Sequence, residues 1–134
     1  MTDDIVIVGA ARTAVGNFNG GFSNIPAHDL GSAAIKAVLE RAKVDPKDVS
    51  EVIIGQILVS GQGQNPARQA SLNAGIPVEA PAWGINQLCG SGLRSVALGA
   101  QQLAEGSGKV VVAGGQESMT MAPHFAYLRN GMKM

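Results

Sequence analysis

Charge, aromatic side chains and cysteine are all scarce in this sequence, and each scarcity excludes a class of protein. Ten basic and ten acidic residues give a net charge of zero, without the basic footprint that nucleic-acid binding needs. A single cysteine, Cys89, excludes an internal disulfide and a multi-cysteine metal site, and a free thiol is typical of a reducing compartment. We therefore expect a cytoplasmic protein with no bound metal and no nucleic-acid partner.

Long apolar runs and a secretory leader are also missing. No stretch of about 18 apolar residues occurs, and a transmembrane helix needs at least that length. The chain starts with MTDD, whereas a secretory signal starts with basic and then apolar residues. The sequence therefore predicts no association with a membrane.

Apolar and small residues are abundant. Hydrophobic residues make up 46% and charged residues 15% of the 134 residues, a length typical of one domain. Such a balance leaves little polar surface, so we expect part of the surface to be covered by another body. The 18 glycines indicate that the secondary-structure elements pack very close together.

Alternating patterns predict that strands and helices follow one another along the chain. Residues 4–10 (DIVIVGA) form a continuous β-branched run, which is typical of a strand buried on both faces. We expect further strands at 51–59, 82–88 and 109–114, and helices at 28–44, 66–74 and 90–105. This alternation is typical of an α/β fold with parallel strand pairs and helices on both faces of the sheet.

Two of the expected helices differ in how polar their surfaces are. The helix that begins at His28 is amphipathic, with an apolar face formed by Leu30, Ala33, Ala34, Ala37 and Val38. Its opposite face holds Ser32, Lys36, Glu40 and Lys43. The helix at 90–105 is charged only at Arg94 and Glu105, so we expect it to be deeply buried.

Cys89 lies between an expected strand and an expected helix, in the stretch INQLCGSGLRSV (85–96). The positive end of a helix dipole favours thiolate over thiol. Gly90 and Gly92 would leave the sulfur accessible and let backbone amides point at a bound oxygen, an arrangement that suits acyl transfer from a thioester. The alternative is an inert, buried cysteine, since free cysteine is among the most buried residue types. The residues alone leave both interpretations open.

The other motifs give weaker signals. Three glycine clusters follow expected strands, but none completes a GxGxxG or GxxxxGK[ST] pattern, so tight turns are favoured over phosphate-binding loops. Either histidine could be a base for Cys89, although a surface or capping role is favoured for His28, and His124 could line a pocket. A soft apolar wall or ordinary core packing would explain the methionines near the end of the chain, Met119, Met121, Met132 and Met134.

Four blocks of the sequence together resemble the thiolase family. They are VGAARTAVGNFNG at the start, GQGQNPARQA in the middle, INQLCGSGLRSV around the cysteine and GGQESMTMAPH near the end. The blocks stand in family order across the whole chain and are most similar to the biosynthetic acetyl-CoA acetyltransferases of that family. The last block argues for a thiolase over a ketosynthase. The resemblance implies a thiolase-like fold, here the N-terminal half-domain, with a mixed, mostly parallel sheet between helix layers.

The resemblance also implies an acyltransferase reaction in which Cys89 is the catalytic nucleophile. Cys89 would take an acetyl group from acetyl-CoA, with its own N–H as one oxyanion donor. The enolate of a second acetyl-CoA would then attack, giving acetoacetyl-CoA and CoA in a reversible reaction. Coenzyme A thioesters are substrates in this scheme, and no permanently bound cofactor is implied. A degradative 3-ketoacyl-CoA thiolase of broader chain length and a non-catalytic assembly fragment are the alternatives.

The family's architecture divides the chain into an incomplete N-terminal core domain, residues 1–117, and the truncated start of an inserted loop domain, residues 118–134. Gln64–Ala70 resembles a region near the family's dimer interface, and Met121–His124 resembles the start of the loop domain. The family further implies a homotetramer built as a dimer of dimers.

Three family motifs have no match in this chain: the GHP histidine, the cysteine of the CxGG block and the asparagine of the NxxGG block. Neither His28 nor His124 matches the GHP histidine. Since removing one member of a catalytic unit can cost nearly the whole rate, we expect these 134 residues to be inactive without the remaining C-terminal part. Nicking, a split protein or truncation would explain the end at RNGMKM, and nicking is favoured because proteases cut at exposed loop tips.

Overall fold

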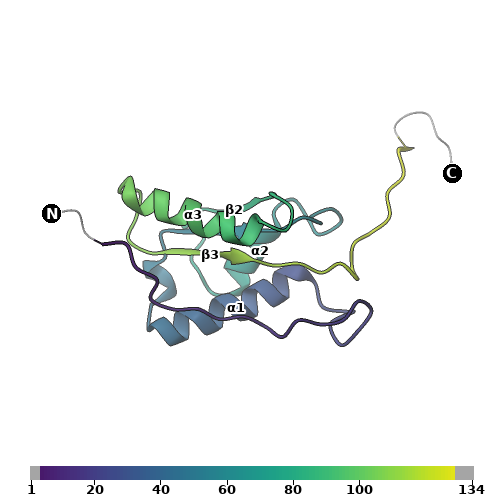
Figure 1. Ribbon diagram of the computed structural model, residues 1–134, viewed down its shortest axis with the longest axis horizontal. Coiled ribbons are helices and arrows are strands. Elements are labelled where there is room, and N and C mark those ends of the chain that lie inside the picture. Colours follow the sequence, from purple (N-terminus) through teal and green to yellow (C-terminus); the bar gives the residue numbers. More distant parts are fainter. Residues whose placement is uncertain (1–3, 129–134) are drawn as a thin grey trace.

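A computed structural model describes residues 4–128 of the chain (Figure 1). Three α-helices and three β-strands alternate along it. In chain order they are α1 (Ala27–Ala42), the short 3-10 helix η1 (Pro46–Asp48), β1 (Glu51–Gly55), α2 (Pro66–Asn73), β2 (Ala82–Ile85), α3 (Ser91–Ala104) and β3 (Val111–Gly115). The helices expected at 66–74 and 90–105 are therefore confirmed to within a residue or so at each end, and the strand expected at 51–59 is shorter.

The three strands form one parallel sheet in the order β2-β1-β3. Val52 pairs with Ala82 of β2 and with Val112 of β3, and the ladder ends where Gly55 pairs with Gly115. The central strand is buried on both faces, which accounts for its unbroken apolar run. The predicted parallel pairing is confirmed, and no antiparallel strand occurs within residues 4–128.

Helices cover the two faces of the sheet, as predicted (Figure 1). Val52 and Ile54 point to the face covered by α2, where they join Ile35 and Leu39 of α1 in the main apolar cluster. Gly55, one position further along the strand, faces α3 on the other side. This alternation along β1 is the two-residue period of a strand between two helix layers.

The buried face of α1 is rotated relative to the prediction. The residues that point inward are Ala27, Gly31, Ser32, Ile35 and Leu39. Ser32 was expected on the polar face but is buried, whereas Ala33 was expected inside but is exposed. Close packing accounts for the small residue at Gly31, because a Cβ built there would overlap the Gln116 side chain and lie 3.3 Å from Cβ of Ala70 in α2. At this part of the inward face of α1, size matters more than polarity.

The strand predicted at residues 4–10 is not formed. This segment runs extended but outside the sheet, and Ile7 is 81% exposed. Its anchors lie on α1 instead: the Arg41 guanidinium donates a hydrogen bond of 2.8 Å to the Ala10 carbonyl, and a Cβ on Gly9 would touch Val38 at 3.2 Å. The prediction of a strand buried on both faces was therefore wrong for the described residues, because the segment has no ladder partner.

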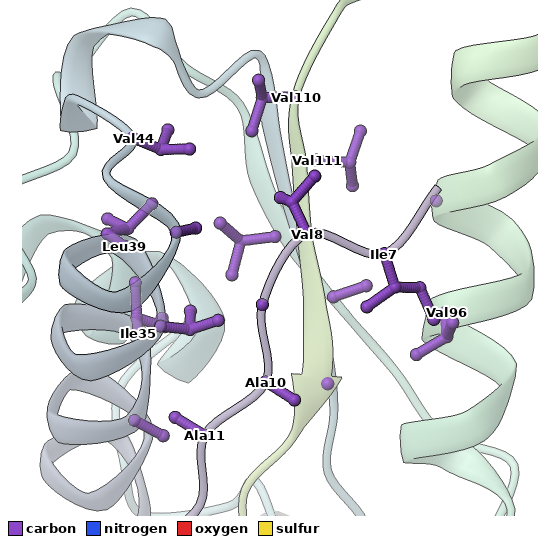
Figure 2. A pocket seen from close by; sticks show the side chains of 18 of the residues that line it. Ile7, Val8, Ala10, Ala11, Ile35, Leu39, Val44, Val96, Val110 and Val111 are labelled. Atoms are coloured by element: carbon purple, nitrogen blue, oxygen red, sulfur yellow. The ribbon is translucent and has the colours of Figure 1, made fainter. Parts of the chain in front are cut away.

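An apolar groove of about 360 Å³ lies between this N-terminal segment, α1, α3 and β3. Figure 2 shows Ile7 directed toward Val96 of α3, with Ile35 and Leu39 of α1 on the opposite wall. The N-terminal segment crosses the groove without filling it. Its β-branched side chains therefore line an apolar groove but remain largely exposed to solvent.

The expectation that α3 is deeply buried also proved wrong for this part of the chain. Its buried residues are the small ones, Ser91, Ser95 and Gly99. Its large apolar side faces outward, and Leu93 is 79% exposed. The helix lies so close to the sheet that only small residues fit, since a Cβ on Gly99 would come within 3.1 Å of the Val111 side chain. None of the helices within residues 4–128 is long and apolar enough to cross a membrane.

The first turn of α3 lies very close to the ends of β1 and β3. A Cβ built on Gly55 would lie 2.6 Å from the Gly92 nitrogen and 2.6 Å from Cβ of Ser91. A Cβ on Gly115 would lie 3.3 Å from Cα of Gly92. The backbone of the helix therefore rests directly on the backbone of the sheet at this end.

Replacing Gly55 by alanine should destabilise the fold by about 1–3 kcal/mol, because the added methyl overlaps backbone that has no room to move. Gly84→Ala is the matched control in the neighbouring strand, where the nearest contact of an added Cβ is an ordinary 3.5 Å. Urea unfolding, followed by the fluorescence of Trp83, the single tryptophan of the chain, measures both variants. Equal stability of the two variants would contradict the close approach.

Candidate functional site

Cys89 lies at the carboxyl end of the parallel sheet, in the connection between β2 and α3. It is exposed and directly precedes Gly90, the N-cap of α3. The ends of β1 and β3, Gly55 and Gly115, lie under the first turn of the same helix. Parallel α/β sheets commonly bind ligands at this edge, where the carboxyl ends of the strands meet. The alternative of a buried cysteine does not hold for the described residues, since Cys89 is exposed.

The backbone before the cysteine turns sharply. Leu88 has a φ of +51°, in the left-handed region that residues other than glycine rarely adopt. Its N–H donates to the side-chain oxygen of Asn86 at 3.0 Å. Its carbonyl accepts a hydrogen bond of 2.6 Å from the Ser91 hydroxyl, which in turn accepts one of 2.8 Å from the Gln87 N–H. Two side chains thus hold the turn from either side.

The backbone N–H groups around the cysteine differ in whether they donate a hydrogen bond. Gly90 N–H donates to the Gln87 carbonyl at 3.1 Å, and Ser91 N–H donates to the Leu88 carbonyl at 3.0 Å. Cys89 N–H donates no hydrogen bond to any of residues 4–128. An exposed thiol therefore lies beside an available backbone donor at the positive end of a helix. Chemically, this arrangement suits a nucleophile that attacks a carbonyl and a donor that stabilises the resulting oxyanion.

Gly92 lies in the first turn of α3 and faces β3. A Cβ built on it would lie 3.6 Å from the Gly115 nitrogen, which is an ordinary contact. The open approach to the sulfur that the sequence suggested for Gly92 stays a prediction.

Glu117, just after β3, fixes the loop that follows β1. Its carboxylate accepts hydrogen bonds from the N–H groups of Ile57 at 2.8 Å and Leu58 at 3.2 Å. Next to it, the Gln116 amide donates to the Gln56 side-chain oxygen at 2.8 Å. Sequence reasoning singled out none of these residues. The available signal was that polar residues directly follow the ends of two neighbouring strands.

The middle block resembling thiolases forms this loop and the start of α2. Asn65 is the N-cap of α2 and accepts a hydrogen bond of 2.9 Å from the Arg68 N–H. Gly61 and Gly63 have φ values of +73° and +86°, which agrees with the prediction that the cluster makes a tight turn. The dimer-interface role that the resemblance implies for Gln64–Ala70 stays a prediction.

The two histidines come from other segments of the fold than Cys89. His28 lies in the first turn of α1, where its Nε2 is 3.7 Å from the Asp29 carboxylate. His124 is exposed, in the coil after β3. No hydrogen bond within residues 4–128 joins either imidazole to Cys89. Nothing in this arrangement supports a role for either residue as the base for Cys89.

Cys89 also lies outside two hollows of the described residues. A hollow of about 330 Å³ is bounded by Arg12–Phe18 and Gln116–Thr120, and Cys89 lines neither it nor the groove described above. Of the methionines proposed as an apolar wall, Met119 lines the smaller hollow but is mostly exposed, and Met121 is also exposed. Met132 and Met134 lie outside the described residues, as does the RNGMKM end. The predicted domain boundary after residue 117 stays a prediction.

Comparison of the sequence with known proteins assigns the chain to a family. The chain matches the model of the thiolase N-terminal domain over residues 5–134. It is 68% identical to an acetyl-CoA acetyltransferase of Rhizobium meliloti (strain 1021) over 130 residues, which cover 97% of this chain and 33% of the relative. Its identity to the acetyl-CoA acetyltransferase of Shinella zoogloeoides is 61% over 134 residues, 100% of this chain and 34% of the relative.

A mammalian protein is similar to almost the same extent. The cytosolic acetyl-CoA acetyltransferase of Rattus norvegicus is 57% identical over 133 residues, which cover 99% of this chain and 34% of the relative. The chain thus spans about a third of the length of the curated relatives it matches. Because the family model covers nearly all of the chain, including all four blocks on which the resemblance was based, the chain belongs to the thiolase family and corresponds to its N-terminal domain.

Proposed function

We propose that this chain is the nucleophile-bearing part of an acyltransferase that moves acetyl groups between coenzyme A thioesters through Cys89. The observation that carries the proposal is the exposed thiol beside an available N–H at the start of α3. Relatives named acetyl-CoA acetyltransferase, at 68% and 61% identity, supply the reaction class.

In the first step, the Cys89 thiolate attacks the carbonyl carbon of acetyl-CoA. A carbon–sulfur bond forms to Cys89, and the bond to the CoA sulfur breaks, so that CoA leaves as a thiolate and takes up a proton. The negative charge on the carbonyl oxygen in between is stabilised by the Cys89 N–H, which no described acceptor occupies. The product is an acetyl-thioester on Cys89.

In the second step, a second acetyl-CoA loses a proton from its methyl group and attacks the acetyl group on Cys89 as an enolate. The new carbon–carbon bond gives acetoacetyl-CoA, and Cys89 leaves as a thiolate. The base for this proton is assigned to the remaining part of the polypeptide, since no hydrogen bond within residues 4–128 joins His28 or His124 to Cys89. The sequence of steps is reversible, so thiolytic cleavage uses the same residues.

Acetyl is the acyl group we propose, because the similar proteins carry that name. A degradative thiolase of broader chain length is the second candidate, and no residue described here favours it. The rat and mouse relatives are called cytosolic, and on that basis we propose a cytoplasmic location. We also propose that the full-length protein is a homotetramer. Its substrates, acetyl-CoA and CoA, would exchange with solution, and it would hold no permanently bound cofactor.

Incubating the full-length protein with acetyl-CoA should add one acetyl group to the peptide that contains Cys89, since the thiol is exposed and its amide is available. Mass spectrometry of the intact and digested protein measures the adduct. Cys89→Ala should carry none, and its turnover should fall by nearly the whole rate enhancement. The exposed serine variant Ser107→Ala, in the turn after α3, is the matched control and should behave like the wild type. Acetylation elsewhere, with Cys89 unmodified, would exclude the proposed nucleophile.

The 134 residues alone should show no formation or thiolysis of acetoacetyl-CoA, because the proposal assigns the proton-transfer groups to the remaining part of the polypeptide. Adding the remaining C-terminal part as a separate polypeptide should restore turnover if the two parts associate. Absorbance of acetoacetyl-CoA measures both reactions. Turnover by the 134-residue chain on its own, lost in Cys89→Ala, would mean that a base within this chain had been overlooked.

A further inference from the structure

The peptide group between Leu88 and Cys89 carries the N–H that the proposed reaction uses, and its orientation depends on a strained residue. Leu88 has a φ of +51°, a conformation that glycine, asparagine and aspartate adopt readily and leucine does not. Left to its own preference, Leu88 would rotate toward an extended or right-handed conformation. That rotation would turn the Cys89 amide and the Cys89 side chain together.

Asn86 opposes this rotation from the N-terminal side. Its side-chain oxygen accepts the Leu88 N–H at 3.0 Å, which is the pattern of an Asx turn across two residues. Its amide nitrogen reaches the Ile57 carbonyl at 3.4 Å, in the loop that Glu117 holds. Asn86 is itself exposed, so its contribution to the apolar core is small. Its contacts are with the backbone of the turn and the neighbouring loop.

Ser91 opposes the rotation from the other side. Its hydroxyl donates to the Leu88 carbonyl at 2.6 Å and accepts from the Gln87 N–H at 2.8 Å. Ser91 is only 3% exposed and is held against Gly55, so its hydroxyl is a fixed point. With the Leu88 carbonyl directed toward α3, the planar trans peptide directs the Cys89 N–H the opposite way. The availability of that N–H thus follows from where the Leu88 carbonyl points.

We infer that Asn86 and Ser91 are positioning residues, which hold Leu88 in its left-handed conformation so that the Cys89 N–H and thiol meet the same thioester carbonyl. The inference rests on the proposed function, because it assigns the purpose of the turn to acyl transfer. Neither side chain touches the reacting atoms in this scheme. Both act through the backbone of Leu88.

Two reactions of the same thiol separate positioning from general reactivity. Acetylation by acetyl-CoA needs the thiol and the oxyanion donor in one geometry. Alkylation by iodoacetamide needs only an accessible thiolate. The thiolate displaces iodide directly, and no tetrahedral intermediate with a negatively charged oxygen forms. Loss of the turn should therefore slow acetylation far more than alkylation, and the pH dependence of alkylation should stay as in the wild type.

In the full-length enzyme, Asn86→Ala should lower the rate of Cys89 acetylation by about 10- to 100-fold, the range expected when an oxyanion donor is displaced by about an ångström. Asn86→Ser is the conservative variant, because a serine hydroxyl makes the same two-residue turn more weakly. It should recover a large part of the lost rate. Ser91→Ala should resemble Asn86→Ala, with the melting temperature reported alongside because Ser91 is buried.

A double-mutant cycle with Leu88→Gly tests whether Asn86 acts through the backbone of Leu88. Glycine populates the left-handed region at little cost, so Asn86→Ala should lower acetylation less in the Leu88→Gly background than in the wild type. Both measurements use variants on the exposed turn, which keeps the test independent of any folding defect caused by Ser91→Ala. An equal loss in both backgrounds would overturn the inference.

The remaining outcomes are also decisive. If wild-type Cys89 is acetylated, and Asn86→Ala is acetylated at the same rate, the positioning role fails while the proposed function stands. If acetylation and alkylation fall together in Asn86→Ala, the turn governs the thiol itself and the inference is wrong. If the wild type is not acetylated at Cys89 at all, the proposed function fails and this inference fails with it.

Discussion

The contact between the backbone of α3 and the backbone of the sheet is the constraint on which the rest of this structure depends. Gly55 and Gly115 present no side chain where the first turn of the helix, at Ser91 and Gly92, meets the ends of β1 and β3. The start of α3 is thereby fixed relative to two strands at once. Since β2 ends at Ile85 and α3 begins at Ser91, the chain must reverse within residues 86–90. The left-handed Leu88 and the exposed Cys89 are consequences of that short connection.

Much of the fold could be predicted because its helices and its central strand follow simple periodic rules. The central strand has an unbroken apolar run because it is covered on both faces, and α2 begins where Asn65 and Pro66 indicate. The N-terminal run shows where the rule fails. A β-branched composition indicates a preference for burial in a sheet, but it does not indicate whether a neighbouring strand is available for pairing. Residues 4–10 have this composition but pair with no strand in the part of the chain that the structure describes.

The packed faces of α1 and α3 could not be predicted from hydrophobicity, because close approach selects for size. Ser32 and Ser91 are buried, while Leu93 is exposed. Where two elements lie so near that a methyl group would overlap, the buried position must be small, and serine can satisfy its own hydroxyl on a nearby carbonyl. Ser95 does this with the carbonyls of Gly92 and Gly114, at 2.6 and 2.8 Å. Polarity is then a poor guide to which face is inside.

The place of Cys89 in the fold could be predicted from the sequence, but the residues that support it could not. Cys89 was expected between a strand and a glycine-rich helix start, and it lies there; its role as the nucleophile stays a prediction. Asn86, Ser91 and Glu117 act through hydrogen bonds to backbone groups, whose directions depend on the conformation of the loops. No periodic pattern reports that conformation. An asparagine two residues before a turn residue was the one local signal available, since it is typical of an Asx turn.

The exposed N-terminal segment has a further consequence for handling this polypeptide in solution. Ile5 to Val8 is an uncharged, β-branched stretch without proline, and it lies beside β3, an edge strand of the sheet (Figure 2). Such a pair presents unpaired backbone donors and acceptors next to a sequence that favours intermolecular β-pairing. We therefore expect self-association of the polypeptide through this edge to increase with its concentration. The apolar surface beside α1 and the sheet would then limit the solubility of the polypeptide.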